Sequence, residues 1–378
     1  MVQIKTFLIQ PRKHLEQMEK EITRLQAELD SVKSKYDNLY HQFNSCASLI
    51  TLPRRVPDDV LQEIFYQTLP TDRNALLDNK AAPLIFTRIC HQWRQVAFTT
   101  PRLWSTIHIY AHATPRFYFG KNDPATNMLS NKQLSEKRDI LLGTAVSEWL
   151  KRSGDLPLHI SFVATSKRRR DPPVVDPYLS FIVPFSSRWK SLVLEGHSTS
   201  FSRIFTLDAA DLRSLELLIL DFDPTGYRNS PSLPQELWSN CGLLASPSLR
   251  KLSIQQAVVT HPTNLSVNWA QLTHLELGAP SGSLSMSMST ASEILQVATR
   301  LVFCGIKIAG WADSPYVRSM RFPLLRHLSI EMEGCVLPFT EKLELPGLRE
   351  INLHVVKNDI TENNVNYKIC LAPLFRPQ

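Results

Sequence analysis

The stretch Leu272-Thr273-His274-Leu275-Glu276-Leu277 decides the fold of this chain, because its pattern, apolar-x-x-apolar-x-apolar, recurs along the C-terminal half. Self-similarity at a regular period of this size indicates a stack of structural repeats. Successive matches begin 26, 34, 23, 26, 27 and 23 residues apart. The other matches are Trp189/Leu192/Leu194, Leu215/Leu218/Leu220, Leu249/Leu252/Ile254, Ala298/Leu301/Phe303, Leu325/Leu328/Ile330 and Leu348/Ile351/Leu353.

Most of these spacings are typical of leucine-rich repeats, and the longest interval contains a proline-rich insertion at residues 230–234. In such a stack, alternate apolar residues of each short strand point into a shared core that the return segments cover. Residues 290–298 predict a helical return segment with a serine or threonine cap. The sequence therefore predicts an α/β chain with an irregular leucine-rich-repeat solenoid over residues 181–378. Residues 110–180 are expected to hold a linker and the first repeat elements, with a helix at 144–151 and a strand at 156–162.

The strand residues between the core positions are expected to point away from the core, since side chains alternate along a strand. Their mixed chemistry predicts a protein target rather than a polyanion. The predicted target-binding residues are Val193, Ile219, Lys251, His274, Glu276, His327 and Glu350, and the same face would carry Ser191, Leu217, Ser253, Ser329 and Asn352.

The N-terminal segment, residues 1–51, carries apolar residues at alternating steps of three and four. They are Leu15, Met18, Ile22, Leu25, Leu29, Val32, Tyr36, Leu39 and Phe43. A seam with this period stays on one side of a helix only if the helix supercoils against a partner, so it indicates a coiled-coil helix. With Leu15 at heptad position a, Glu28 would face Lys33 across a parallel dimer. We expect self-association through residues 15–43; the alternative is a single amphipathic helix folded back on its own domain.

A helical module follows over residues 52–109. Pro57 suits the first position of a helix, and the acidic residues Asp58 and Asp59 complement the positive end of its dipole. The next apolar residues form one stripe at helical spacing: Val60, Leu61, Ile64 and Phe65. A second helix is predicted over residues 83–97, with one apolar side formed by Leu84, Ile85, Ile89, Trp93 and Val96, and a strand is predicted at 107–109.

This module resembles the F-box. Residues 56–65, Val-Pro-Asp-Asp-Val-Leu-Gln-Glu-Ile-Phe, are similar to the F-box opening. Residues 89–94, Ile-Cys-His-Gln-Trp-Arg, followed by Thr-Pro-Arg-Leu-Trp at 100–104, are similar to the closing half in F-box-like proteins abundant in mushroom-forming fungi. The sequence departs from the pattern at Val56, Asp59 and Phe86, where leucine, glutamate and leucine are usual, but these changes are conservative in volume or charge.

The resemblance implies docking on the small adaptor subunit of cullin-based ubiquitin ligases, and through it on a cullin. Helix-in-groove binding of this kind needs apolar anchors at helical spacing. The contact residues that the resemblance implies are Pro57, Val60, Leu61, Ile64 and Phe65, with Ile89 and Trp93 either at the contact or in the internal core. The alternative is that residues 52–109 form an ordinary helical cap on the repeats.

Composition argues against several other classes. Hydrophobic residues make up 43% and charged residues 20%, which is typical of a folded globular protein, and no apolar run of about eighteen residues could span a membrane. The net charge of +7 comes from residues 1–180, with 25 Lys+Arg and 18 Asp+Glu, whereas residues 181–378 hold 17 of each. A neutral repeat region argues against nucleic acid. The six cysteines lie far apart, which fits reduced thiols in the cytoplasm or nucleus.

The sequence carries no signal of catalysis or of a cofactor. It has no G-x-G-x-x-G or phosphate-binding P-loop motif, no H-E-x-x-H or other metal-ligand spacing, and no G-x-S-x-G elbow. We therefore expect no enzymatic activity, no cofactor and no metal. The basic run at residues 167–170 is either a solvated loop or a nuclear-import signal.

The predicted function is that of a substrate-receptor subunit of a cullin-type (SCF) ubiquitin ligase. Residues 52–109 would hold the adaptor, and the repeats would bind a target protein. The alternative is a coiled-coil and leucine-rich-repeat scaffold for protein interaction with no role in ubiquitin transfer. An enzyme is the third and weakest interpretation.

Overall fold

The computed structural model of the chain describes residues 2–49, 56–112, 140–165, 176–222, 233–255, 262–278, 286–308, 319–333, 342–356 and 365–370. The chain divides into two units, Met1–Glu63 and Ile64–Gln378, and the division falls within helix α2 (Asp58–Gln67). The finer domain bounds expected at residues 51, 109 and 180 stay predictions. Among the described residues, no helix combines the length and the apolar character that crossing a membrane requires.

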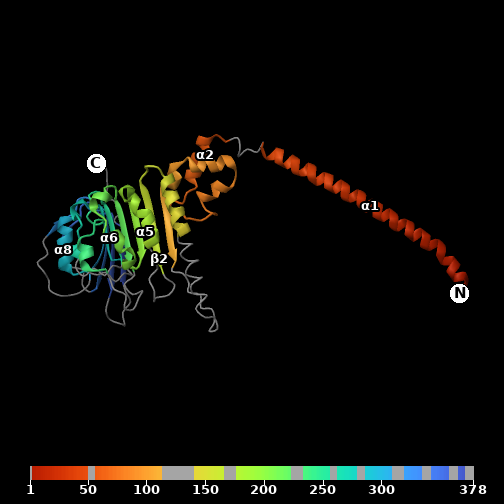
Figure 1. Cartoon of the computed structure of the whole chain (residues 1–378). Coiled ribbons are helices and arrows are strands. Elements are labelled where there is room, and N and C mark those ends of the chain that lie inside the picture. Colours follow the sequence, from red (N-terminus) through yellow and green to blue (C-terminus); the bar gives the residue numbers. More distant parts are fainter. Residues whose placement is uncertain are drawn as a thin grey trace, which may run out of the picture. The chain divides into compact units, whose positions relative to one another are not determined.

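The first unit contains α1 (Val2–Leu49), one continuous helix (Figure 1). It runs through Pro11, although proline removes one backbone hydrogen bond from a helix interior. The nine apolar residues of the predicted seam are all exposed, with 51% to 68% of their surface accessible to solvent. The long N-terminal helix is therefore as predicted, whereas its pairing with a partner stays a prediction.

The helical module of the second unit is built from short elements. After α2 come the 3-10 helix η2 (Leu84–Arg88), helix α3 (His91–Phe98) and the 3-10 helix η3 (Pro101–Trp104). The prediction of one helix over residues 83–97 was wrong, because the backbone at Cys90 is extended, with φ −153° and ψ 173°. The Cys90 sulfur accepts a hydrogen bond from the backbone N–H of Trp93 at 3.5 Å, so this residue starts a new helix rather than continuing the old one.

One ten-stranded sheet forms the body of the second unit, and its strands lie in the order in which the chain makes them. All neighbours are parallel except the last pair, which is antiparallel. The strands are β1 (Thr106–His112), β2 (Leu158–Thr165), β3 (Trp189–Gly196), β4 (Leu217–Phe222), β5 (Lys251–Ile254), β6 (His274–Leu277), β7 (Phe303–Ile308), β9 (His327–Glu333), β11 (Glu350–Val356) and β12 (Val365–Cys370).

A repeated hydrogen-bond pattern joins successive strands from β4 to β11. At the start of each strand, one backbone carbonyl accepts hydrogen bonds from two consecutive N–H groups of the next segment, at 2.7 to 3.2 Å. The five accepting residues are Glu216, Arg250, Thr273, Val302 and Arg326. The recurring sequence pattern therefore corresponds to a recurring backbone arrangement, in which each new segment adds one parallel strand.

One of the seven predicted strand registers is incorrect. The prediction placed Ala298, Leu301 and Phe303 at the core positions of their strand, but Leu275 of β6 pairs with Cys304 and Leu277 pairs with Ile306. The core positions of β7 are therefore filled by Cys304 and Ile306, and Phe303 lies in register with His274 on the opposite face. The set Leu301/Cys304/Ile306 fits the same recurring pattern, because buried cysteine packs as a small hydrophobe.

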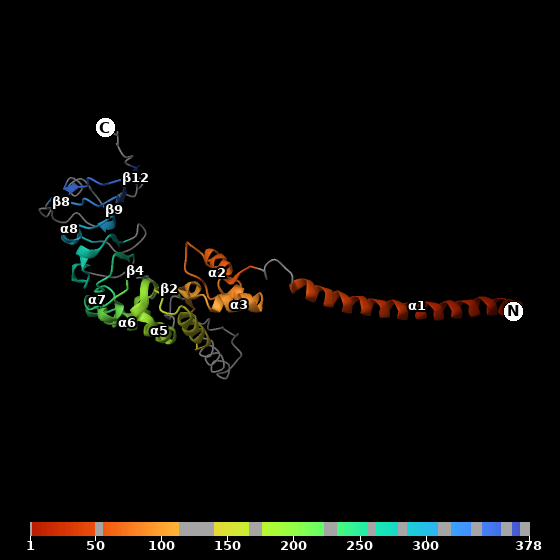
Figure 2. The ribbon, with the colours of Figure 1, turned by 90° about the horizontal axis from the view of Figure 1, so that it is seen from above.

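The core lies between the sheet and a layer of short helices. Figure 2 shows α5 (Asp176–Ile182), α6 (Ser202–Phe205) and α7 (Gln235–Ser239) along the same side of strands β2 and β4. Aromatic rings join the two layers: the ring of Phe162 lies 5.5 Å from that of Phe201, and Phe201 lies 5.7 Å from Phe222. Phe205 lies 6.0 Å from Phe222 and 4.9 Å from Trp238. The described helices thus cover the leucine-rich face of the sheet. We call the opposite face, over which no described helix packs, the open face.

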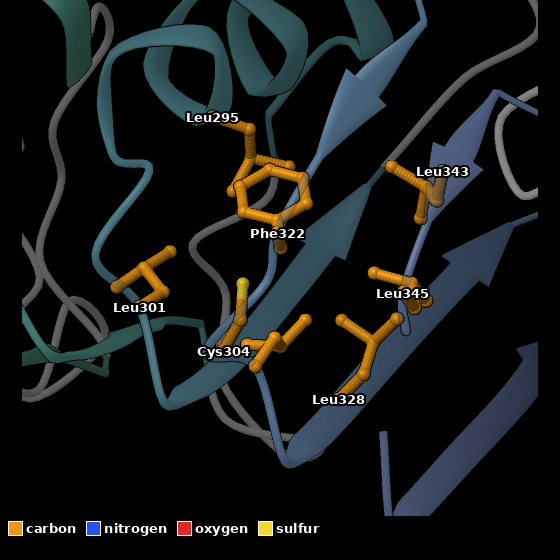
Figure 3. A pocket seen from close by; sticks show the side chains of 8 residues that line it. Leu295, Leu301, Cys304, Phe322, Leu328, Leu343 and Leu345 are labelled. Atoms are coloured by element: carbon orange, nitrogen blue, oxygen red, sulfur yellow. The ribbon is translucent and has the colours of Figure 1, made fainter. Parts of the chain in front are cut away.

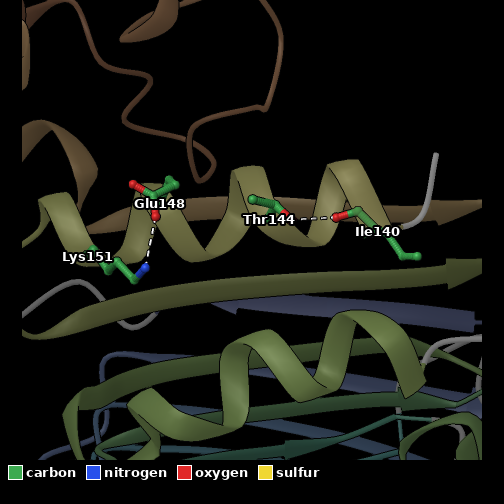
Figure 4. A network of polar contacts seen from close by, with 4 residues as sticks. All are labelled: Ile140, Thr144, Glu148 and Lys151. Carbon is green, nitrogen blue, oxygen red and sulfur yellow. Dashed lines mark hydrogen bonds and ion pairs between the residues drawn. The ribbon is translucent and has the colours of Figure 1, made fainter. Parts of the chain in front are cut away.

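A helix over residues 140–152 packs beside the first strands, and it includes the predicted helix 144–151. It buries Val146, Trp149 and Leu150, and the ring of Trp149 lies 4.9 Å from that of Trp104. Its solvent side carries polar contacts within the helix, including an ion pair between Glu148 and Lys151 at 2.9 Å (Figure 4).

The C-terminal part of the core includes a second, two-stranded sheet of β8 (Met320–Arg321) and β10 (Leu343–Glu344). Beside it, apolar side chains from several elements surround a small pocket (Figure 3). The cavity has a volume of only about 10 Å³, which is barely enough for one water molecule. It is therefore a packing defect of the core and not a ligand site. Its lining residues are Leu295, Leu301, Cys304, Phe322, Leu325, Leu328, Leu343 and Leu345.

The two edge strands of the main sheet, β1 and β12, differ in how they are protected and in direction. At the β1 edge, the backbone N–H of His108 donates to the carbonyl of Ala75 at 2.7 Å, and Leu76 forms an isolated bridge with His108. At the other edge, β12 runs antiparallel to β11. The chain therefore protects the first edge with its own backbone and reverses direction at the second.

Candidate functional site

An aromatic cluster of Phe65, Phe86 and Trp93 fixes the elements of the helical module. The rings of Phe65 and Phe86 are stacked with centroids 4.1 Å apart, and Trp93 lies 5.0 Å from Phe65. Because these residues come from α2, η2 and α3, the cluster holds all three elements together. Helical spacing places Phe65 on the inner side of α2.

Two further contacts fix the ends of these helices. The guanidinium of Arg102 lies 3.8 Å from the centre of the Tyr66 ring, which ties α2 to η3. The indole N–H of Trp104 donates to the carbonyl of Ala97 at 2.8 Å, which ties η3 to the end of α3. The module is thus a rigid support for whatever side chains it leaves exposed.

Burial separates the predicted adaptor-binding residues into two groups. Leu61 and Phe65 are only 1% and 0% exposed, so a partner cannot reach them in this structure, and Trp93 is half-buried within the aromatic cluster. The exposed group contains Pro57, Val60, Ile64 and Ile89. The sequence could not make this distinction, since all four stripe residues of α2 are apolar and neighbouring pairs lie only about 100° apart around a helix.

Three exposed isoleucines flank the aromatic cluster in the second unit. Ile64 precedes Phe65 on α2 and is 45% exposed, whereas Ile85 precedes Phe86 on η2 and is 37% exposed. Ile89 follows η2 and is 53% exposed. Ile85 was predicted on the apolar side of its helix but was not among the predicted adaptor contacts. We refer to Ile64, Ile85 and Ile89 as the exposed isoleucines.

The open face of the sheet brings together the residues predicted to contact a target. Register pairs Val193 with Ile219 across β3 and β4, and pairs Lys251 with His274 across β5 and β6. Glu276 lies opposite Ser253, and His327 lies opposite Glu350. All seven predicted positions therefore fall on one continuous face.

Side chains on this open face interact across the strands. The Ser253 hydroxyl donates to Glu276 Oε2 at 2.9 Å, and His327 Nδ1 lies 3.3 Å from Glu350 Oε2. The ring of His274 stacks on that of Phe303, with centroids 6.2 Å apart and planes at 16°. These contacts orient the polar groups before any partner arrives.

Partial burial makes several open-face residues less charged than usual. Burial lowers the pKa of His274, and the nearby Lys251 and His327 lower it further. Burial also lowers the pKa of His159, with a contribution from Lys190. These two imidazoles are therefore neutral near pH 7. Near the end of β3, burial and the neighbouring Asp221 raise the pKa of Glu195.

The sequence reasoning missed a buried ion pair on the open face. Lys307 Nζ lies 2.7 Å from Glu331 Oε1, and the two side chains are only 14% and 7% exposed. The second carboxylate oxygen of Glu331 is buried and has no hydrogen-bond partner among the described residues. Alternation one residue beyond the set Leu325/Leu328/Ile330 places Glu331 on this face, but the incorrect register predicted for β7 assigned Lys307 to the core face.

A polar group near the β1 edge was also missed. His108 Nδ1 lies 2.8 Å from the hydroxyl of Ser161, which accepts a hydrogen bond from Asn74 Nδ2 at 3.1 Å. Register pairs His108 with Ser161 across β1 and β2, so the open face continues to the first strands. The recurring pattern does not extend to these two strands, and the available signals were the short strands predicted at residues 107–109 and 156–162.

The described residues offer no metal site or reactive thiol in the core. They contain no group of three or more histidine, cysteine or acidic residues that could hold a metal ion. Burial raises the pKa of Cys241 to about 11 and that of Cys304 to about 12, so both thiols stay protonated at neutral pH. The basic run at residues 167–170 lies outside the described residues.

No protein-family model matches this chain, and no curated protein matches it. The resemblances to the F-box and to leucine-rich repeats therefore rest on the residues quoted above.

Proposed function

We propose that this chain is a non-enzymatic substrate-receptor subunit of a cullin-type ubiquitin ligase. In this proposal the helical module is an F-box-like domain that docks on the ligase adaptor subunit. The sheet and its helices form a leucine-rich-repeat solenoid whose open face binds a target protein. The observation that carries the proposal is the set of exposed isoleucines beside a tightly packed aromatic cluster.

The exposed isoleucines suit docking for a physical reason. A β-branched side chain has few rotamers, and the cluster of Phe65, Phe86 and Trp93 fixes the backbone that presents it. Anchors that are already ordered lose little conformational entropy on binding, so burying them in an apolar groove gives a large net gain in affinity. Val60, 45% exposed and one turn before Ile64, extends this apolar side of α2.

The open face suits a protein target. It carries cations and carboxylates on neighbouring strands, such as Lys251 on β5 and Glu276 on β6, together with the stacked pair His274 and Phe303. Such a mixed surface offers complementary contacts to a folded protein or peptide, whereas a polyanion would need a basic one.

Copurification with the adaptor subunit tests the adaptor part of the proposal. The purified full chain is mixed with recombinant adaptor, and the wild type is compared with Ile64→Lys and Ile89→Lys. A lysine at a desolvated anchor position places a charge in an apolar groove, so we expect adaptor recovery to fall at least about tenfold. Val297→Lys on α8 (Met288–Val297) is the matched control, because Val297 is 50% exposed and lies on another element.

The control variant should recover adaptor like the wild type, and all variants should keep the wild-type circular dichroism and melting temperature. Failure of the folded wild type to bind any adaptor, or equal binding by the lysine variants, would overturn the assignment.

The second candidate is an interaction scaffold without a role in ubiquitin transfer. The exposed seam of α1 favours it, because a long helix whose nine seam residues are exposed needs a partner of its own. The scaffold interpretation would be preferred if complexes assembled by the wild-type chain contain other proteins but no adaptor.

A further inference from the structure

Helix α1 presents an exposed apolar seam. Its nine members, from Leu15 to Phe43, are each more than half exposed. Tyr36 of the seam stacks on Tyr40 of the same helix, with ring centroids 5.8 Å apart. A seam with a 3.5-residue period matches a second helix with the same period, and a second copy of this chain supplies one.

Charges beside the seam are divided into two blocks. With Leu15 at heptad position a, the flanking positions e and g of the first half hold Glu19, Glu21 and Glu28, and all three side chains are exposed. The same positions of the second half hold Lys33 and Lys35, which are also exposed. Glu21 also forms an ion pair with Arg24 of its own helix, at 2.9 Å. The positions that face away from the seam carry charges of both signs, such as Lys20 and Asp30.

We propose that two copies of α1 pair in antiparallel orientation, with Leu15 of one copy level with Leu39 of the other. This register keeps eight seam residues of each helix, from Leu15 to Leu39, in the shared core. Leu29 then faces Leu25 of the second copy. In an antiparallel pair, e positions face e positions and g positions face g positions.

Charge complementarity selects this orientation. Glu19 faces Lys33, and Glu21 faces Lys35; two-fold symmetry makes each contact twice, giving four attractive contacts. The only like-charge contact is between the two copies of Glu28. A parallel pair in register places Glu28 against Lys33 twice and gives its remaining flanking positions no opposite-charge carboxylate–ammonium contact. The acidic half of one helix therefore lies best against the basic half of the other.

A charge-swap series in the full chain distinguishes the two orientations by sedimentation. Glu19→Lys replaces two attractive contacts of the antiparallel pair with repulsive ones, so self-association should weaken roughly tenfold or more. Adding Lys33→Glu restores opposite charges and should return the dissociation constant to within about threefold of the wild type. In a parallel pair the Lys33→Glu change of the double variant would instead place a new carboxylate against Glu28. Asp30→Lys, the same charge change on the outer b position, is the matched control and should have little effect.

A distance measurement provides an independent test of the orientation. A spin label introduced at position 13 through an unnatural amino acid should give a separation of roughly 40 Å in the antiparallel pair, since 28 helical residues lie between the labels at about 1.5 Å each. A separation below about 20 Å would mean parallel helices and would overturn the proposal. A wild-type chain that stays monomeric at tens of micromolar would overturn it as well, and so would a Glu19→Lys variant that behaves like Asp30→Lys.

Discussion

At the scale of single residues, Phe65 organises the helical module. Its ring is fully buried and contacts the rings of Phe86 and Trp93 at 4.1 and 5.0 Å. Its neighbour Ile64 points outward on the same helix and is 45% exposed. Two adjacent apolar residues therefore have opposite roles: one holds the module together, and the other is available to a partner.

Replacing Phe65 by alanine should destabilise the protein far more than replacing the exposed Ile64. The change removes a ring from a packed cluster and leaves a cavity, so we expect the free energy of unfolding in urea to fall by about 3–5 kcal/mol. Ile64→Ala is the control on the adjacent position, and because that side chain is half exposed its loss should cost less than about 1 kcal/mol. Equal losses for the two variants would contradict the difference in burial between Phe65 and Ile64.

At the scale of elements, the strands were predictable and their connections were less so. Alternation of leucines such as Leu275 and Leu277 identifies a half-buried strand because side chains alternate by face. The interruption at Cys90 was not predictable from periodicity, since the apolar spacing continues through it while the backbone does not. Helix α8 has a cap of the predicted kind, because the Ser287 hydroxyl accepts from the N–H of Thr290 at 3.1 Å.

The candidate site was predictable only in part for a related reason. Helical spacing identified the apolar stripe of α2 but gave no means to tell the buried Leu61 from the exposed Val60, because that depends on residues distant in sequence. On the sheet, the recurring sequence pattern covered only the first residues of each strand. Lys307 and Glu331 lie beyond it, and their pairing depends on the register between β7 and β9.

Lys307→Ala should destabilise the sheet between β7 and β9. It leaves the Glu331 carboxylate buried without its cation, and removing one partner of a buried pair typically costs about 3–5 kcal/mol. Lys190→Ala is the matched control, because Lys190 and Glu216 are 3.7 Å apart but 41% and 52% exposed, so that loss should stay below about 1 kcal/mol. Urea titration of both variants measures the difference. If the two variants unfold alike, Lys307 and Glu331 do not form a buried pair in solution.

At the scale of the whole molecule, the thermal stability of the sheet unit should not depend on α1. The seam residues of α1 are exposed, so deleting residues 1–49 removes none of the buried apolar side chains that stabilise the sheet. We expect the melting temperature of the sheet unit, followed by near-ultraviolet circular dichroism of its buried tryptophans, to change by less than about 4 °C, which corresponds to roughly 1 kcal/mol or less for a unit of this size. A larger fall would mean that α1 contributes to the packing of the second unit.

The unequal edges of the sheet limit how molecules of this protein can stack. If both edge strands were parallel and had unpaired backbone groups, the sheet of one molecule could extend the sheet of the next, and fibres would form. Here the segment at Ala75 and Leu76 occupies backbone groups of β1, and the reversed β12 presents an antiparallel pattern that β1 does not match. Pairing of the β1 edge of one molecule with the β12 edge of the next is therefore disfavoured.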